Sequence, residues 1–207
     1  MYSVNCVNIK SLNPDDIEFL WRTASKERLN KAMRFRNEAD SVRCLVAGEL
    51  IRRLNEGPVI YNDYGKPYFQ KKETFFNISH SGDWVAIAHG PSEVGIDIEH
   101  VTVEIESVSS YCFSDEERNY INETGSTDKE ICFTRLWTLK ESYLKYRGTG
   151  LTDRMKDISF KVKGSDVFLE SDPRVGFYSC MLDEAYSMAV CGMDEGIEIN
   201  YWKGHRS

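Results

Sequence analysis

Apolar and polar positions alternate along several short stretches of this chain. Such alternation has the period of a strand with one buried face. We predict strands over residues 2–9, 61–64, 75–79, 84–89, 94–99, 158–162, 167–170, 177–181 and 187–191. Gly, Pro, Ser and Asp residues lie between these stretches and favour chain reversal, so the strands should form meanders.

Helical spacing appears in four places. Residues 41–54 carry an apolar stripe, and residues 129–146 form a longer periodic segment that ends at Gly148. Asn13 and Pro14 predict the start of a helix, as a cap and a first-turn residue. Ser114 followed by Glu117 has the capping-box spacing and predicts a helix over residues 116–122.

Helices and strands are therefore mixed in each half of the chain. This pattern predicts an α+β fold with two packed subdomains meeting near residue 100, that is, residues 1–100 and 101–207.

The bulk composition is that of a globular protein with 41% apolar residues and 29% charged residues. No apolar stretch reaches the length of a membrane span, and the N-terminus lacks a secretory pattern, so we expect a cytoplasmic protein that binds no membrane. No two of the six cysteines have CxxC spacing, which predicts free thiols and no zinc site.

Charge is unevenly distributed. The formal net charge is −7, which argues against a nucleic-acid partner. Residues 22–53 nevertheless hold nine Lys or Arg and only four Asp or Glu. This basic segment is either a solvated helix face, which is the more common case, or a phosphate-binding surface.

Residues 95–99, GIDIE, place two carboxylates on one face of a predicted strand, since alternate side chains point the same way. Asp97 and Glu99 are either a solvated acidic face or a pair of oxygen ligands for Mg²⁺. On the helix over residues 129–146, Trp137, Glu141 and Lys145 share one face. Glu141 and Lys145 are either a surface ion pair or a metal ligand or base with a cation beside it.

Residues 77–82, NISHSG, end a strand with small hydroxyl residues around His80. Backbone N–H groups and a donor side chain suit a phosphate there. Lys66 and Pro67 similarly present a lysine on a rigid turn.

Together, GKP, FNISHS, GIDIE, FSxxE and WTLKESYLK resemble the 4′-phosphopantetheinyl transferases in their order and spacing, over roughly residues 26–151. The resemblance is to the two-subdomain type that activates peptide synthetases such as surfactin synthetase. It implies two similar halves, each a small mostly antiparallel sheet with helices, packed with pseudo-twofold symmetry.

The resemblance also implies site residues. The implied Mg²⁺ ligands are Asp97, Glu99 and Glu141, and the implied catalytic residues are Glu141 and Lys145. The implied coenzyme A contacts are Arg28, Lys31, Arg43, Lys66, Pro67, Ser79 and His80. Arg28 stands where relatives often carry lysine.

The implied reaction is attack of a carrier-protein serine on the β-phosphorus of coenzyme A, with release of 3′,5′-adenosine bisphosphate. Phosphoryl transfer depends mainly on positioning and charge neutralisation. Glu141 and a metal-ordered water both remain candidates for the base. The expected partners are coenzyme A and an apo acyl or peptidyl carrier protein, and the enzyme is expected to be a monomer.

Two other interpretations use the same residues. A metal-dependent pyrophosphate hydrolase would use water as nucleophile, and a non-catalytic coenzyme A-binding module would not need Glu141 and Lys145 on one helical face. For carrier docking, residues 111–121 offer aromatic side chains, although we expect Phe113 and Ile121 to be core residues.

Overall fold

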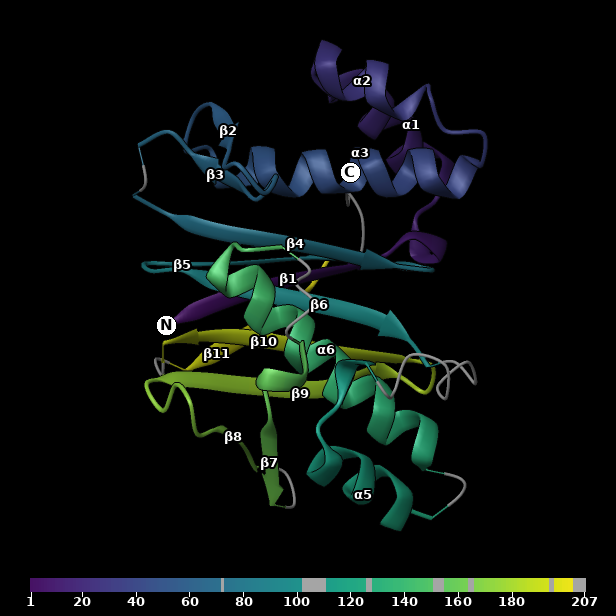
Figure 1. The fold of residues 1–207 in the computed structure, drawn as a ribbon. Helices are drawn as coiled ribbons and strands as arrows, with labels where there is room; N and C mark the ends of the chain where they lie inside the picture. Colours follow the sequence, from purple (N-terminus) through teal and green to yellow (C-terminus); the bar gives the residue numbers. More distant parts are fainter. Residues whose placement is uncertain are drawn as a thin grey trace.

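Two β-sheets packed face to face form the centre of the molecule (Figure 1). The computed structural model describes residues 1–71, 73–101, 111–125, 128–150, 155–163, 166–193 and 196–202. One apolar cluster lies between the sheets and takes Val4 and Ala86 from one sheet and Ile96 and Met188 from the other. The α+β class is confirmed.

The first sheet has the strand order β11-β1-β5-β4, and the second has the order β6-β10-β9. Their bounds are β1 Tyr2–Asn8, β4 Phe75–Ser81, β5 Trp84–Gly90, β6 Val94–His100, β9 Val175–Asp183, β10 Tyr186–Met193 and β11 Ile197–Tyr201. All pairs are antiparallel except β1 with β11. Two hairpins lie outside these sheets, β2 Val59–Tyr61 with β3 Pro67–Phe69 and β7 Phe160–Lys163 with β8 Asp166–Leu169.

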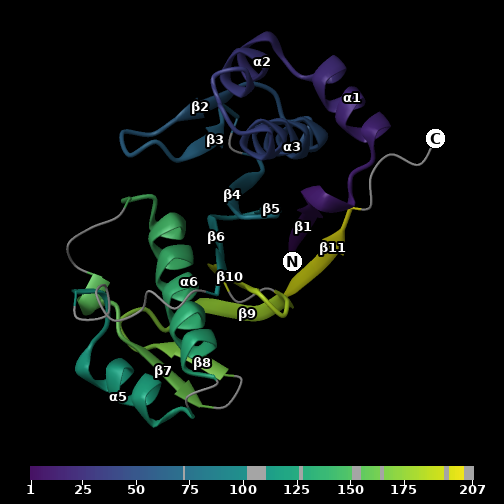
Figure 2. The same cartoon turned by 90° about the vertical axis from the view of Figure 1, so that its right-hand side faces the viewer.

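Helices cover the outer faces of the two sheets. The first group, α1 Pro14–Thr23, α2 Lys26–Ala32 and α3 Glu38–Leu54, lies over the β11-β1-β5-β4 sheet. The second group, α5 Asp115–Glu123 and α6 Lys129–Arg147, lies with β6, β9 and β10 on the other side (Figure 2). Short 3₁₀ turns occupy Ile9–Ser11 and Met155–Asp157.

Helix ends follow the predicted capping. Asn13 Oδ1 accepts from the backbone N–H of Asp16, and the Asp16 carboxylate accepts from that of Asn13, a reciprocal capping box. Ser114 and Glu117 do the same at the start of α5. Gly148 ends α6 with a φ of 65°, a left-handed conformation that glycine adopts without strain.

The predicted strand over residues 61–64 is wrong. The strand β2 ends at Tyr61, and the chain then turns. Asn62 Oδ1 accepts from the backbone N–H groups of Tyr64 and Lys66, so a side chain holds this turn instead of a β-ladder. The other differences are that α3 begins three residues early because Asn37 caps it, and that α2, β3 and β11 were not predicted.

Both halves of the chain contribute to both sides of the core. The strand β6 lies in the first hundred residues but pairs with β10, while β11 from the C-terminus pairs with β1. The boundary near residue 100 stays a prediction. All six cysteines are free thiols, as predicted, and no helix within the described ranges is long and apolar enough to cross a membrane.

Candidate active site

Helix α6 lies directly against strand β6, and a glycine permits this contact. A Cβ added to Gly95 would stand 1.9 Å from the carbonyl oxygen of Ser142 and 2.5 Å from the backbone nitrogen of Tyr146. Such distances are far below van der Waals contact, so only glycine lets the helix approach this closely. The glycine of GIDIE therefore brings the face of α6 that carries Glu141 and Lys145 onto the acidic residues of β6.

The ammonium of Lys145 reaches across this contact. Its Nζ lies 2.5 Å from Oδ1 of Asp97 and 3.0 Å from Oγ of Ser79. The Ser79 hydroxyl in turn donates to Oδ1 of Asp97 at 3.0 Å. Three of the predicted site residues, from β4, β6 and α6, thus meet at one point.

Burial raises the pKa of all three predicted metal ligands. The pKa of Glu141 rises to about 7 because its carboxyl is desolvated and lies near the negative charge of Asp97. Desolvation also raises the pKa values of Asp97 and Glu99. Two buried oxygens, Oδ2 of Asp97 and Oε1 of Glu141, have no hydrogen-bond partner. Unpartnered buried carboxylate oxygens are costly, and a cation would relieve that cost.

The donor set is suited to Mg²⁺ in type, since hard carboxylate oxygens are its preferred protein ligands. As the side chains stand, no group of three His, Cys, Asp or Glu residues within the described part of the chain converges closely enough to hold a metal ion. Lys145 instead supplies the positive charge beside Asp97.

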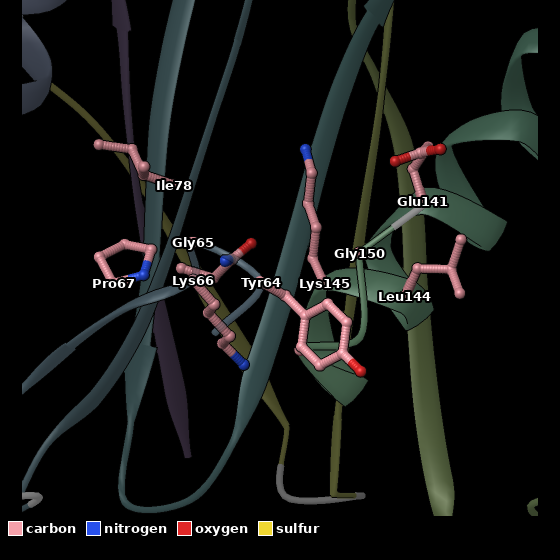
Figure 3. A pocket seen from close by; sticks show the side chains of 11 residues that line it. Tyr64, Gly65, Lys66, Pro67, Ile78, Glu141, Leu144, Lys145 and Gly150 are labelled. Atoms are coloured by element: carbon pink, nitrogen blue, oxygen red, sulfur yellow. The ribbon is translucent and has the colours of Figure 1, made fainter. Parts of the chain in front are cut away.

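A cleft of about 300 Å³ opens next to this cluster. Figure 3 shows Glu141 and Leu144 on one side, Lys66 and Pro67 on the other, and Lys145 and the Tyr64 ring between them. The cleft is therefore bounded by α6, by the β2–β3 hairpin and by β4. It has the volume for part of a small-molecule ligand.

Lys66 is fully engaged with protein groups. Its Nζ donates to the Glu93 carboxylate at 2.6 Å and to the carbonyl oxygens of Val94 and Tyr146 at 3.3 and 3.1 Å. A cation at the last turn of α6 also complements the helix dipole. Lys66 thus fastens the hairpin turn to the end of α6, and Asn62 adds a bond to the carbonyl of Gly148.

The predicted phosphate contacts lie in two places, around His80 and around Arg28, and Lys31 belongs to both. His80 on β4 has a lowered pKa because its ring is partly desolvated and lies near the positive charges of Arg43, Lys145 and Lys31. Three positively charged side chains therefore lie around the His80 ring, next to the Lys145–Asp97 pair. Arg43 also donates to the carbonyl of Gly82 and to Asp40.

Arg28 points elsewhere. Its side chain lies over Gly48 of α3, where a Cβ would stand 2.8 Å from Nε. With Lys31 and Arg52 it lines a separate groove of about 410 Å³ between α2, α3 and β2. Arg28 is not among the charges that act on His80.

Lys140 anchors α6 from the opposite side. Its fully buried Nζ pairs with Glu117 at 2.7 Å and donates to the carbonyls of Cys112 and Met155. Burial lowers the pKa of Lys140, and the negative charge of Glu117 opposes that shift. The glutamate of FSxxE and the first lysine of WTLKESYLK thus fix α6 against α5.

Several contributing residues were not predicted from the sequence. Asn77 and Ser81 also contact β6, and together with Ser79 they occupy alternate positions on β4. That period-two run of polar residues was a visible signal. Tyr64 and Glu93 contribute through tertiary contacts, and Asn62 bonds to Gly148 in addition to holding its own turn, so none of the three left such a pattern.

On the expected docking segment, Phe113 and Ile121 are buried core residues, as predicted, while Tyr111 and Tyr120 are exposed. Tyr111 is the more open of the two, with 77% of its surface exposed.

Comparison with known proteins defines the class. A family model described as the 4′-phosphopantetheinyl transferase superfamily matches residues 93–191. The 4′-phosphopantetheinyl transferase psf-1 of Bacillus pumilus is 32% identical over 191 residues, covering 84% of this chain and 81% of that protein. A 4′-phosphopantetheinyl transferase of Bacillus subtilis is 28% identical over 213 residues, covering 94% and 95%. The 4′-phosphopantetheinyl transferase Sfp of Bacillus subtilis strain 168 is 29% identical over 196 residues, covering 88% of each chain.

These similarities define a transferase enzyme. The chain belongs to the 4′-phosphopantetheinyl transferase superfamily. The three relatives carry the name of a transferase and not of a pyrophosphate hydrolase or a binding module.

Proposed function

We propose that this enzyme transfers the 4′-phosphopantetheine group of coenzyme A to a serine of an apo acyl or peptidyl carrier protein and releases 3′,5′-adenosine bisphosphate. One observation carries the proposal. The Lys145–Asp97 pair and the unpartnered Oε1 of Glu141 lie beside a cleft whose neighbouring face is positively charged. A positive face suits the phosphates of coenzyme A, and the acidic cluster suits a metal on its pyrophosphate.

Asp97, Glu99 and Glu141 are the proposed Mg²⁺ ligands. When bound, the metal would neutralise pyrophosphate charge and stabilise the leaving group. The unpartnered oxygens of Asp97 and Glu141 and their raised pKa values support this assignment, because both mark buried carboxyl groups whose negative charge Lys145 offsets only in part.

Lys145 is proposed to hold a positive charge where negative charge grows on the phosphate. Glu141, with a pKa of about 7 in the metal-free protein, is one candidate to accept the proton of the carrier serine. A metal-ordered water is the other.

His80, Lys31 and Arg43 are proposed to bind the 3′-phosphate of coenzyme A. Arg28 is proposed to reach the same phosphate from the groove that it lines together with Lys31. Pro67, which lines the cleft, is proposed to contact the nucleotide. Lys66 is proposed to act there mainly by holding the hairpin turn, since its ammonium is already bonded. Ser79 is proposed to orient Lys145 and Asp97.

The remaining finer proposals concern organisation. The two helix-covered sheets are proposed to be related by pseudo-twofold symmetry. The enzyme is proposed to be a cytoplasmic monomer that binds neither nucleic acid nor membrane.

The test is incubation of the purified protein with coenzyme A, Mg²⁺ and an apo carrier protein, followed by mass spectrometry. Transfer predicts a mass gain on the carrier together with adenosine bisphosphate, and both should vanish with EDTA or with Asp97→Asn. Adenosine bisphosphate without a mass gain would instead show hydrolysis.

A further inference from the structure

The strands β4 and β6 run side by side at the junction of the two sheets without a shared backbone ladder. Within the described strands, β4 pairs with β5 and β6 pairs with β10. Backbone N–H groups on the free edge of β6 therefore need other acceptors.

Side chains of β4 supply them. Asn77 Oδ1 accepts from the N–H of Ile96 at 3.0 Å. Ser79 Oγ accepts from the N–H of Ile98 at 3.2 Å. Ser81 Oγ accepts from the N–H of His100 at 3.2 Å. The partners advance by two residues on both strands, so this side-chain ladder fixes one parallel register.

The two hydroxyl groups of the side-chain ladder also bond to the acidic side chains. Ser79 donates its proton to Oδ1 of Asp97, and Ser81 donates its proton to Oε2 of Glu99 at 3.0 Å. Each serine thus accepts from the backbone and donates to a carboxylate one residue earlier on β6. A hydroxyl has one proton and two lone pairs, so these bonds determine its orientation.

We propose that Asn77, Ser79 and Ser81 are positioning residues for the metal ligands: the side-chain ladder holds β6 in register against the first sheet and aims Asp97 and Glu99 at the metal. The proposal rests on the metal assignment made under the proposed function. Groups that orient metal ligands in this way contribute to metal affinity even though they never touch the ion.

Ser81 is the informative position, because Ser79 also contacts Lys145. Ser81→Ala removes one acceptor of the His100 N–H, which the Glu99 carboxylate also contacts, and it removes the donor to Glu99. Ser81→Thr keeps a hydroxyl. Ser179→Ala is the matched control. Ser179 lies on strand β9, and its Oγ likewise accepts a partly buried hydrogen bond, from Arg135 Nε at 2.9 Å.

Two measurements without carrier protein test the proposal, so that no turnover is involved. The first is hydrogen exchange at the His100 amide in the metal-free protein. The second is the Mg²⁺ concentration that gives half of the thermal stabilisation in the presence of coenzyme A. Ser81→Ala should speed exchange at His100 and raise the Mg²⁺ midpoint about 10- to 100-fold. Ser81→Thr should restore both, and Ser179→Ala should change neither.

A folded Ser81→Ala protein with unchanged His100 exchange or an unchanged Mg²⁺ midpoint overturns the proposal. If the parent enzyme itself shows neither Mg²⁺-dependent stabilisation nor transfer, the proposed function fails. The part of the proposal that says the side-chain ladder orients the metal ligands Asp97 and Glu99 then fails as well. Exchange at His100 would still decide whether the side-chain ladder holds β6.

Discussion

The Nζ atom of Lys145 lies 2.5 Å from Oδ1 of Asp97, and this ion pair joins helix α6 to strand β6. Asp97 is almost fully buried, and the Lys145 side chain is partly exposed toward the cleft. A buried carboxylate needs a partner, so Lys145 partly offsets the desolvation of Asp97. The same ammonium lines the cleft proposed to hold coenzyme A.

Lys145→Met should lower kcat strongly and leave the KM for coenzyme A within a few-fold. Methionine keeps much of the aliphatic part of the lysine side chain but removes the ammonium charge. That charge stabilises the transition state more than the bound substrate, because negative charge on the phosphate is greatest in the transition state. Losing one such stabilising donor costs about 100- to 1,000-fold in kcat in other enzymes. Steady-state kinetics and coenzyme A binding on the same purified variant provide the measurement.

Lys10→Met is the control for that experiment, because Lys10 forms an exposed ion pair with Asp83 away from the cleft. It should leave both constants unchanged. An unchanged kcat in Lys145→Met would remove Lys145 from the catalytic residues.

Lys31→Ala should raise the KM for coenzyme A and change that for 3′-dephospho-coenzyme A little. A charged hydrogen bond is worth on the order of 1.5–3 kcal/mol, which corresponds to about 10- to 100-fold in affinity. Lys26→Ala removes a positive charge from the exposed start of the same helix and serves as the control. Equal losses with both substrates would show that Lys31 does not recognise the 3′-phosphate.

In the absence of Mg²⁺, coenzyme A binding should become tighter as the pH falls from about 8 to about 6, the range in which histidine titrates. Mg²⁺ is left out because Glu141, with a pKa of about 7, would be protonated in the same range and would weaken metal binding. The pKa of His80 is lowered in the free protein, so the ring is mostly neutral near neutral pH. A bound phosphate would favour the protonated ring and raise this pKa, and binding would then take up a proton. Affinity therefore increases as protons become available.

The imidazole resonances of His80, titrated with and without coenzyme A, measure this shift. Affinities for coenzyme A and for 3′-dephospho-coenzyme A at each pH give the second readout, and His80→Ala should give the two ligands the same pH dependence. The same pH dependence for both ligands would contradict a 3′-phosphate contact.

Gly95→Ala should reduce both stability and transfer. The new methyl group would overlap the backbone of α6, so the helix must move away from β6 and take Glu141 and Lys145 with it. Overpacking of this kind costs about 1–3 kcal/mol in the free energy of unfolding. Chemical denaturation and kcat measure the two effects.

Gly125→Ala is the matched control, because a Cβ at Gly125 meets nothing within 4 Å. That variant should match the parent protein in both measurements. A fully active and stable Gly95→Ala protein would mean that α6 can be displaced without affecting the site.

The sequence alone determined the local elements of the fold. Alternation located β1, which has one face in the core, and short apolar runs located β5 and β6, which are buried on both faces. Capping residues located the starts of α1 and α5 because those bonds are made within a few residues. The segment at residues 61–64 was misassigned because the Asn62 side chain holds a turn there, and alternation cannot distinguish that from a short strand.

The sequence also determined which residue types could form the site, since the spacing of Glu141 and Lys145 on one helix face and of Asp97 and Glu99 on one strand follows from helix and strand geometry. Only the tertiary structure decided the partners of these side chains.

Lys145 pairs with Asp97 and not with Glu141. Lys66 bonds to Glu93 and to the end of α6, and Ser81 bonds to Glu99. Each of these contacts joins segments at least 18 residues apart, and local periodicity carries no information about how such segments approach. Their approach is set by how closely two elements pack, as at Gly95, where the absence of a single Cβ lets α6 reach β6.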